Sequence, residues 1–219
     1  MPRPRSPLLS RERIVSAALA LIDAEGLSAL STRRLAAELG VSGPSLYNHF
    51  ATKDELLEAV ADAVIAHVDI APLGARPWPE ALRTWAVSYR ETLAAHPHLV
   101  PVTAHGPGRR PHALRMADAV YGTLVDAGWP PREATRIGAL MRYFVVGAAT
   151  ASFAAGFVDD PALYASDYPH LSDAHRLQAH RSEIDQEAFE TGLDALIAGL
   201  ELRFQPQPHV TPQRRQPTG

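Results

Sequence analysis

The chain has 219 residues, of which 46% are hydrophobic, and it contains no cysteine. This length and hydrophobic content suit one or two globular domains, whereas the lack of cysteine excludes disulfides, thiolate catalysis and cysteine-based zinc sites. The net charge of −3 is uneven, because residues 1–53 hold seven Lys and Arg against four Asp and Glu, while the remainder holds 14 against 20. A basic N-terminal segment on an acidic body is typical of a nucleic-acid-reading domain joined to a domain with another task.

The sequence predicts no signal peptide and no membrane span. Residues 1–9 are basic and rich in proline, and no apolar run follows them, so we expect a disordered arm. The longest apolar-rich run, residues 143–158, is shorter than the about 18–20 residues that cross a bilayer. We therefore expect a soluble, cytoplasmic protein with no membrane partner.

The first predicted helix covers residues 10–25. Ser10 is a good N-terminal cap. Ile14, Ala18 and Leu21 recur at helical spacing and form one apolar face, and Gly26 ends the helix. We expect this helix to support the two that follow.

Residues 32–53 predict two short helices joined by a tight turn. Thr32 can cap the first helix, and Gly40 can adopt the left-handed conformation that ends it. Ser42 can cap the second helix, and Pro44 stands where a missing N–H costs nothing. This is the pattern of a helix-turn-helix, whose second helix can enter a DNA major groove.

Turns between two short helices are common in helical proteins, so the pattern alone favours DNA binding only modestly. The outward face of the second helix strengthens the DNA-binding interpretation. The outward residues are polar or polar-tipped, whereas a merely solvated face usually carries Lys and Glu. They are Ser45, Tyr47, Asn48 and His49, left over once Leu46 and Phe50 face inward. Basic residues flank the motif at Arg33, Arg34 and Lys53.

The segment LSTRRLAAELGVSGPSLYNHFATKDELLEAV closely resembles the DNA-binding segment of the tetracycline-repressor (TetR) family of bacterial transcriptional regulators. The resemblance implies an all-α fold, with a three-helix DNA-binding head and a helical regulatory body that forms a four-helix interface in a homodimer. It implies no enzymatic activity and no cofactor. It places the DNA contacts on Thr32, Arg33, Gly43, Pro44, Ser45, Tyr47, Asn48, His49 and Lys53.

These residues are expected to divide into two roles. Tyr47, His49 and Lys53 would hold phosphates, while Asn48 would read a base edge, because an amide can pair bidentately with adenine. Gly43 departs from the family pattern, since it has no side chain to read a base. Ser45 and Asn48 would therefore carry more of the specificity.

The remainder of the chain reads as a connector and a helical body. A helix begins near Thr52 and runs to about residue 69, and the proline-rich segment IAPLGARPWPE ends it. Further helices are predicted over residues 78–95, 111–127, 131–157 and 184–204. In the loop HGPGRRP, the pair Arg109 and Arg110 could bind an anion, although a solvated surface pair is the commoner outcome. The predicted organisation is a disordered arm (1–9), a helix-turn-helix domain (10–53), a connector helix (54–70), a ligand-binding and dimerisation domain (71–204) and a disordered tail (205–219).

Residues 143–158 suggest how the body associates. The segment is apolar on nearly every face, and Gly147, Ala151 and Ala155 form a stripe of small residues that permits close helix packing. A second copy of the chain would cover it through a two-fold contact, although packing within the monomer is the alternative. The polar segment 159–183 reads as a functional or mobile loop. Its histidines recur every five residues and share no helix face, so we expect no metal site.

A ligand pocket is expected among the body helices, lined by aromatic and large apolar side chains. The candidates are Trp85, Tyr89, Tyr121, Met141, Phe144 and Phe153. The predicted function is a ligand-responsive regulator, usually a repressor in the family, that binds a palindromic double-stranded DNA operator and is released by an unknown small-molecule effector. The alternatives are an effector-independent DNA-binding protein and a small helical enzyme, for which no catalytic constellation stands out.

Overall fold

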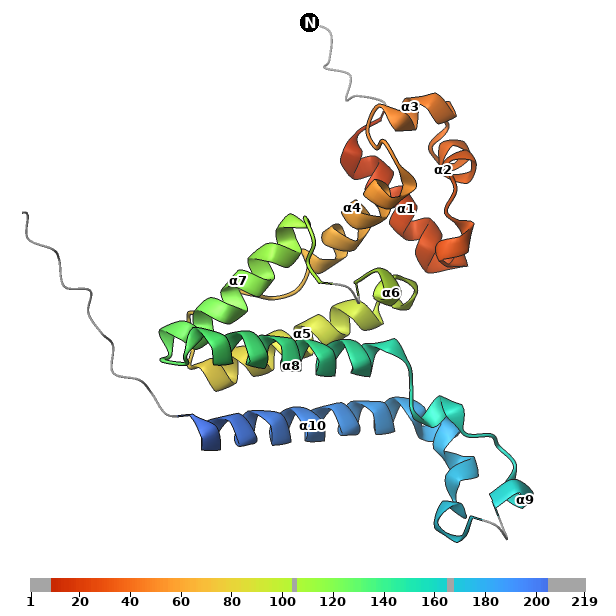
Figure 1. Cartoon of the computed structure of the whole chain (residues 1–219). Coiled ribbons are helices and arrows are strands. Elements are labelled where there is room, and N and C mark those ends of the chain that lie inside the picture. The colour runs from red at the N-terminus through yellow and green to blue at the C-terminus, as the bar shows by residue number, and fades with distance from the viewer. Residues whose placement is uncertain (1–8, 104–105, 165–167, 205–219) are drawn as a thin grey trace, which may run out of the picture.

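The computed structural model describes residues 9–103, 106–164 and 168–204, and within these ranges the chain is helical without a strand. The predicted all-α class is therefore confirmed. A small head of α1–α3 stands on α4, which leads into a larger body of long helices (Figure 1). The expected disordered arm and tail, Leu9 excepted, lie outside the described residues.

The head consists of α1 (Arg11–Glu25), α2 (Thr32–Leu39) and α3 (Gly43–Tyr47), packed with the first turns of α4 (Lys53–Ile65). Its core is aliphatic apart from Phe50, and Leu99 from the body closes it. Because this core is shared with η2 (Pro97–Leu99), the head and the body are in direct contact. The members of the core are Ile14, Ala18, Leu21, Ile22, Leu30, Leu35, Ala36, Leu39, Leu46, Phe50, Leu56, Val60, Val64 and Leu99.

Side-chain caps fix the beginnings of α1, α2 and α4, whereas Ser42, the predicted cap of α3, makes no capping hydrogen bond with its side chain. Ser10 Oγ accepts the N–H of Arg13 at 3.2 Å, as predicted, and Thr52 Oγ1 accepts the N–H of Glu55 at 3.0 Å. The predicted cap at Thr32 is wrong, because Ser31 Oγ accepts the N–H of Arg34 at 3.2 Å and Thr32 is the first helical residue. The serine one position earlier already has the extended backbone that a cap requires.

Gly40 makes the turn of the helix-turn-helix. Its φ of 66° and ψ of 34° are left-handed, a conformation that costs other residues energy. Its N–H donates to the carbonyl of Ala37, and the N–H of Val41 donates to that of Ala36. These two bonds form a Schellman motif, which turns the chain sharply enough to bring α3 against α2.

The connector helix α4 is tied to the body by Asp62. The helix ends at Ile65, one turn before the predicted end, and Asp62 is 8% exposed. Its Oδ1 accepts the N–H groups of His112 (2.9 Å) and Ala113 (3.1 Å), and its Oδ2 lies 2.8 Å from His112 Nδ1. Because α7 (Pro111–Asp126) has no side-chain cap of its own, α4 supplies that cap from a distant part of the chain.

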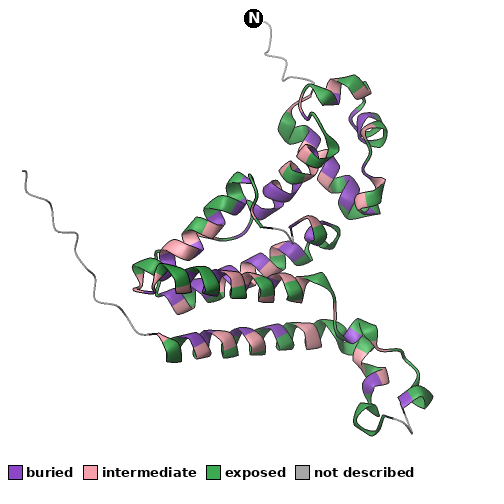
Figure 2. Cartoon of the chain, in the orientation of Figure 1, coloured by how far each residue is buried: buried purple, intermediate pink, exposed green. Residues whose placement is uncertain are grey.

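The body is a bundle of four long helices with a shared core. They are α5 (Trp78–Ala94), α7, α8 (Pro131–Thr150) and α10 (Arg181–Arg203), with the short α6 (Val100–Thr103) beside α8. Figure 2 shows that the buried faces of α5, α8 and α10 point toward one another, whereas the lower face of α10 is exposed. The fully buried Leu82, Tyr89, Leu124, Met141 and Leu193 lie in this core.

The predicted long apolar helix ends earlier than expected. Helix α8 ends at Thr150, because Ala151 has extended backbone with φ −158° and ψ 151°. The chain then forms the 3-10 turn η3 (Ala154–Gly156), in which the Ser152 hydroxyl accepts the N–H of Ala155 at 3.2 Å. A serine that bonds to nearby backbone competes with the helix. The predicted stripe of Gly147, Ala151 and Ala155 is therefore wrong, since only Gly147 lies in α8.

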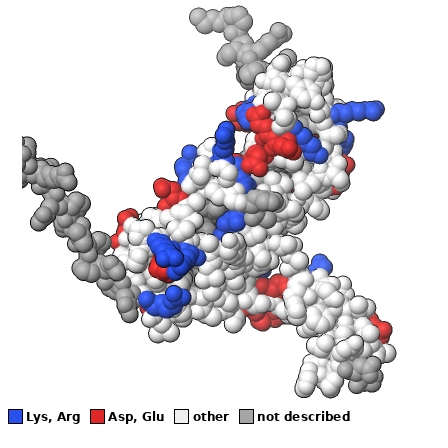
Figure 3. All heavy atoms as spheres, viewed as in Figure 1, with Lys and Arg blue, Asp and Glu red and all other residues white. Residues whose placement is uncertain are grey.

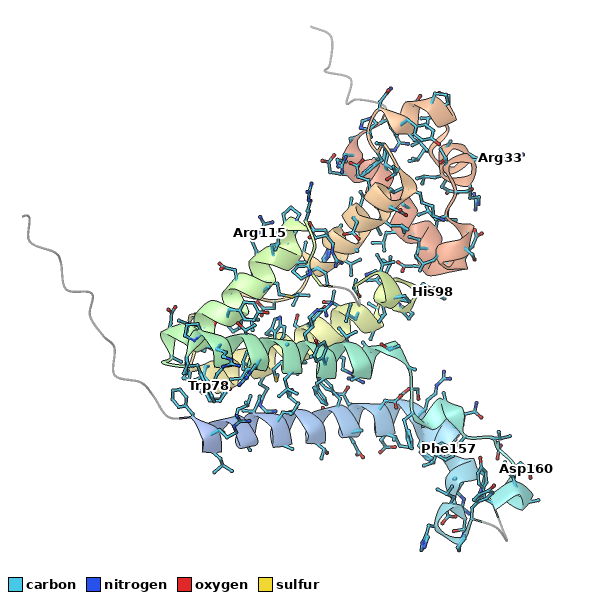
Figure 4. All side chains as sticks on the ribbon, viewed as in Figure 1. Arg33, Trp78, His98, Arg115, Phe157 and Asp160 are labelled. Carbon is cyan, nitrogen blue, oxygen red and sulfur yellow. The ribbon has the colours of Figure 1, made fainter. Side chains whose placement is uncertain are left out.

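The segment expected to be a loop folds into short helices that project beyond the end of α8 (Figure 1). They are α9 (Pro161–Tyr164), η4 (Pro169–Leu171) and η5 (Ala174–His180). Phe157 packs against Phe153 and Tyr164, with ring centroids 5.1 and 6.4 Å apart. Figure 4 shows Phe157 where this projection meets the body.

Candidate nucleic-acid interface and ligand cavity

Helix α3 lies at the outer end of the head, away from the body (Figure 1). The helix ends at Tyr47, three residues before Phe50, which was predicted to lie in it. Leu46 and Phe50 are each 5% exposed, so they anchor α3 and the turn after it in the head core. Tyr47 is 59% exposed, and Asn48 is exposed beside it. The predicted division of this short helix into an apolar inner face and a polar outer face is therefore present.

Arg11 fixes the position of the chain after α3. Its guanidinium lies 3.9 Å from the centre of the Phe50 ring, donates to the carbonyl of His49 and forms an ion pair with Glu55 at 3.0 Å. Glu55 Oε2 in turn accepts the N–H of Ala51 at 2.9 Å. Cation–π and ion-pair contacts on one guanidinium restrain α3 against α1 and α4.

The two arginines at the start of α2 have different surroundings. Arg34 pairs with Glu25 at 3.0 Å and with Glu38 at 2.9 Å, whereas no ion pair is seen for Arg33 within the described residues. Arg33 projects outward from the head in Figure 4. Arg33 is thus the arginine of the pair whose charge faces solvent without a carboxylate partner.

The remaining predicted contact residues differ in how far they are exposed. Pro44 and Lys53 are exposed, whereas Thr32, Gly43, Ser45 and His49 are partly buried. Ser45 Oγ lies 2.7 Å from Ser42 Oγ, so one of its hydrogen bonds is already made. Figure 3 shows basic side chains on the outer side of the head, and acidic ones beside basic ones where the head meets α4.

A second feature is a partly open cavity of about 60 Å³, lined by residues of α4, α5, α6, α7 and α8 and of the segment just before α7. It is small beside the about 300–1,000 Å³ of sites for drug-sized ligands. Most of its wall is apolar or aromatic, with two arginines and one threonine. The lining residues are Ile65, Trp85, Tyr89, Thr103, Pro107, Arg110, Ala113, Met116, Ala117, Val120, Tyr121, Gly138 and Arg142.

The structure brings three of the six predicted pocket residues together at this cavity, namely Trp85, Tyr89 and Tyr121. The other three do not line it. Met141 is fully buried in the body core, and Phe144 stacks on Phe189 of α10 with ring centroids 5.2 Å apart. Phe153 is 71% exposed, because α8 ends before it.

The polar groups of the wall are mainly hydrogen-bond donors. Arg142 Nη2 donates to the carbonyl of Thr103 at 2.7 Å, and Arg110 Nη2 donates to that of Gly106 at 2.6 Å. Burial raises the pKa of the Tyr89 hydroxyl above its usual value of 10, although the guanidiniums of Arg142 and Arg110 act in the opposite direction. Trp85 is 2% exposed, and its Nε1 has no hydrogen-bond partner among the residues that the structure describes.

Sequence reasoning missed the two arginines of the cavity. Arg110 was expected on the surface but is 4% exposed, because its guanidinium packs between the loop carbonyls and Glu58 of α4, with Nε 3.2 Å from Oε2. Arg142 was not among the predicted pocket residues. The burial of Arg110 beside Glu58 and the contact of Arg142 with Thr103 join residues that are far apart in the sequence, so no local pattern predicts them.

The described residues contain neither a membrane-spanning helix nor a cluster of metal ligands. No helix there is long and apolar enough to cross a membrane. No group of three or more His, Cys, Asp or Glu side chains is placed to hold a metal ion.

Two family descriptions match the chain. Residues 14–60 match the family described as "Bacterial regulatory proteins, tetR family". Residues 71–204 match the family described as "Tetracyclin repressor-like, C-terminal domain". The first match contains the helix-turn-helix, and the second contains most of the cavity wall.

Individual proteins resemble the chain over nearly its whole length. The tetracycline repressor protein class E of Escherichia coli is 32% identical over 204 residues, which cover 92% of this chain and 95% of that protein. The crystal structure of a possible TetR family transcriptional regulator from Streptomyces coelicolor A3(2) has a TM-score of 0.75 at 33% identity, covering 89% of this chain and all of that one. ActR of Streptomyces coelicolor in complex with actinorhodin has a TM-score of 0.72 at 31% identity, covering 90% and 99%.

Proposed function

Because the chain belongs to the TetR family of transcriptional regulators, we propose that it binds a palindromic DNA operator as a homodimer and is released by a small-molecule effector. Family membership makes it a regulator and not an enzyme. The observation that carries the proposal is the exposed polar face of α3, which Leu46 and Phe50 hold outward on the head. We propose that it acts in the cytoplasm and that it is a repressor, as is usual in the family.

The proposed DNA contacts are the exposed side chains at the outer end of the head. Arg33 and Lys53 supply positive charge for phosphates, and Tyr47 adds a hydroxyl beside them. Asn48 is the proposed base reader, because its amide is exposed and makes no side-chain hydrogen bond within the described residues. Ser45 has a lesser share, since its hydroxyl already bonds to Ser42.

Exposed uncharged faces on α8 and α10 support the homodimer. Leu140 and Tyr143 of α8 are 41% and 70% exposed, and Leu202 of α10 is 90% exposed. Along α10 an exposed stripe at helical spacing consists of Ala188, Thr191, Ala195, Ala198 and Leu202. Figure 3 shows few charged atoms over this part of the surface. Apolar faces of this kind are typical of surfaces that pair with a second copy.

The contacts of α4 suggest how a ligand alters DNA binding. Arg110 lines the cavity and pairs with Glu58 of α4, and Asp62 of the same helix caps α7. A ligand that shifts α7 or Arg110 therefore acts on the helix that carries the head. In the dimer this would change the spacing of the two α3 helices, which must be about 34–36 Å to reach successive major grooves.

An effector-independent DNA-binding protein is the second candidate, and the cavity argues against it. A domain that only binds DNA needs no cavity lined by arginines and aromatic rings. The structure of ActR bound to actinorhodin shows that a protein of this fold at 31% identity takes up a small molecule. We therefore propose residues 10–53 as the DNA-binding domain, 54–70 as the connector and 71–204 as the ligand-binding and dimerisation domain.

The DNA proposal is tested by selecting binding sites from random duplex DNA and titrating the selected site. We expect a palindrome, with Lys53→Ala weakening binding to all sequences and Asn48→Ala relaxing choice at one or two positions. Lys53 is the only lysine in the chain, so its acetylation in free and bound protein reports directly on the contact. Selection of no palindrome, or equal acetylation of Lys53 with and without DNA, would contradict the proposal.

The dimer proposal is tested at Ala195. An arginine there places two like charges across a two-fold axis without disturbing the monomer core, since Ala195 is exposed. We expect Ala195→Arg to be monomeric by sedimentation and to lose operator binding, while Ala94→Arg, on the exposed side of α5, stays dimeric. A dimeric Ala195→Arg protein would place the interface elsewhere.

A further inference from the structure

The cavity wall presents donors and positive charge but, among its described residues, no carboxylate. Its two charged residues are Arg110 and Arg142, and its lining includes no Asp or Glu. The carbonyls of Thr103, Gly106 and Pro107 already accept hydrogen bonds from these guanidiniums. A neutral ligand rich in donors would find few acceptors there, whereas an anion meets both charge and donors.

Trp85 adds an independent observation. Its side chain is 2% exposed and lines the cavity, yet its Nε1 finds no acceptor among the described residues. Arg90 Nε and Trp129 Nε1 are likewise unpaired there, but neither residue lines the cavity. A buried donor without a partner is destabilising. A ligand acceptor that reaches the indole on binding would remove that destabilisation.

The size and lining of the cavity narrow the ligand further. At about 60 Å³ the cavity is well below the about 300–1,000 Å³ of sites for drug-sized ligands, so a large ligand is excluded. The rings of Trp85, Tyr89 and Tyr121 form much of the wall, so a flat ring packs there better than a branched chain. We propose that the cavity binds a small aromatic carboxylate, with its ring among these side chains and its carboxylate at Arg110 and Arg142.

Arg110 also gives this ligand class a way to act. Its Nε lies 3.2 Å from Oε2 of Glu58 on α4, so the guanidinium already forms an ion pair with that carboxylate. A ligand carboxylate at the same arginine competes with Glu58, so it loosens a contact between the cavity and the connector helix. The inference rests on the cavity being the effector site of the proposed function.

The test is calorimetric titration of the full chain with benzoate and with benzamide, its neutral counterpart of the same shape. We expect benzoate to bind at least about tenfold more tightly, as a charge-assisted contact of about 1.5–3 kcal/mol requires. Arg142→Gln should weaken benzoate binding at least about tenfold. Arg115→Gln, an exposed arginine on α7 that points away from the cavity in Figure 4, should leave it unchanged.

Glu58→Gln provides a readout that a purely structural role of Arg110 would not give. Glu58 is 52% exposed, so the variant should fold, and removal of the competing charge should tighten benzoate binding about threefold or more. The inference is overturned by equal binding of benzoate and benzamide, or by no benzoate binding up to about 10 mM, where a ligand with a Kd near 1 mM would fill the site. Unchanged affinity in Glu58→Gln overturns the role of Arg110.

These outcomes are separable from those of the proposed function. Selection of a palindromic operator uses protein without ligand, so it can succeed while benzoate fails, and then only the ligand class is wrong. Failure of operator selection together with tight benzoate binding would instead leave the cavity assignment standing and remove the DNA proposal.

Discussion

Replacing Asp62 with alanine should weaken the contact between α4 and the start of α7. The carboxylate accepts the N–H groups of His112 and Ala113 at the start of α7, and it also contacts the His112 ring. Loss of a helix cap costs about 0.5–2 kcal/mol. The N–H of Ala113, a residue 5% exposed, would also lose its partner, at about 1–3 kcal/mol.

The free energy of unfolding should therefore fall by about 2–4 kcal/mol, which lowers Tm by about 5–15 °C in a chain of this length. Asp62→Asn keeps one carbonyl oxygen for the backbone groups, so it should lose about half as much. Thermal denaturation at one fixed protomer concentration measures the effect, since dimerisation makes Tm depend on concentration. The matched control is Asp118→Ala, an exposed carboxylate on α7, which should change stability by no more than about 0.5 kcal/mol.

The same variant should also lose its response to ligand. If Asp62 helps transmit ligand binding to the head, Asp62→Ala should bind operator with similar affinity with and without a ligand that weakens operator binding by the unchanged protein. A loss of stability below about 1 kcal/mol would show that the Asp62 cap contributes little to holding α4 against α7. A normal ligand response in a destabilised variant would show that Asp62 is structural only.

Three further results are expected. Arg33→Ala should lower affinity for all DNA and reduce the slope of log affinity against log salt concentration by about 1, without changing Tm. Arg34→Ala should instead cost at most about 1 kcal/mol of stability, because its ion pairs with Glu25 and Glu38 are exposed. Equal DNA affinities of the two variants would contradict this. Gly138→Ala should destabilise the body by about 1–3 kcal/mol, because the new Cβ would lie 2.2 Å from Tyr121 Cε1. Gly122→Ala, which has open space, should be neutral or gain up to about 1 kcal/mol in chemical denaturation. The N–H of Ala51, followed by Arg11, lowers the pKa of Glu55 below 4.5, so its stabilisation is present above that pH and is lost as pH falls through the lower folded-state pKa; an acid titration of Tm should be flatter for Glu55→Gln.

The parts of the molecule that could be predicted from sequence rest on contacts between near neighbours. Ser10 and Thr52 each cap a helix by accepting the N–H three residues on. At the end of α2, Gly40 and Val41 donate to carbonyls three and five residues back, respectively. Such contacts leave a pattern in a short window. In α3 and the turn after it, Leu46 and Phe50 lie inside and Tyr47 and Asn48 outside, and this split follows from the same short-range spacing.

The prediction of the body was weaker for the same reason. Apolar spacing could not show that α8 stops at Thr150, because residues 151–158 are as apolar as those before them. A serine hydroxyl bonded to a nearby N–H redirects the chain there. Likewise, Phe144 and Phe153 looked like pocket residues, but the first stacks against α10 and the second is exposed.

By itself the sequence determined the helical class, the helix-turn-helix and its outward polar residues, since 3.6-residue periodicity and capping are local properties of the chain. Only the tertiary structure decided that Arg110 is buried beside a cavity, that Asp62 of α4 caps α7, and that Trp85 Nε1 lacks a partner among the described residues. Each of these depends on groups far apart in sequence, about 50 positions in the case of Asp62 and His112. Periodicity records which side of a helix is buried, but not which distant side chain lies against it.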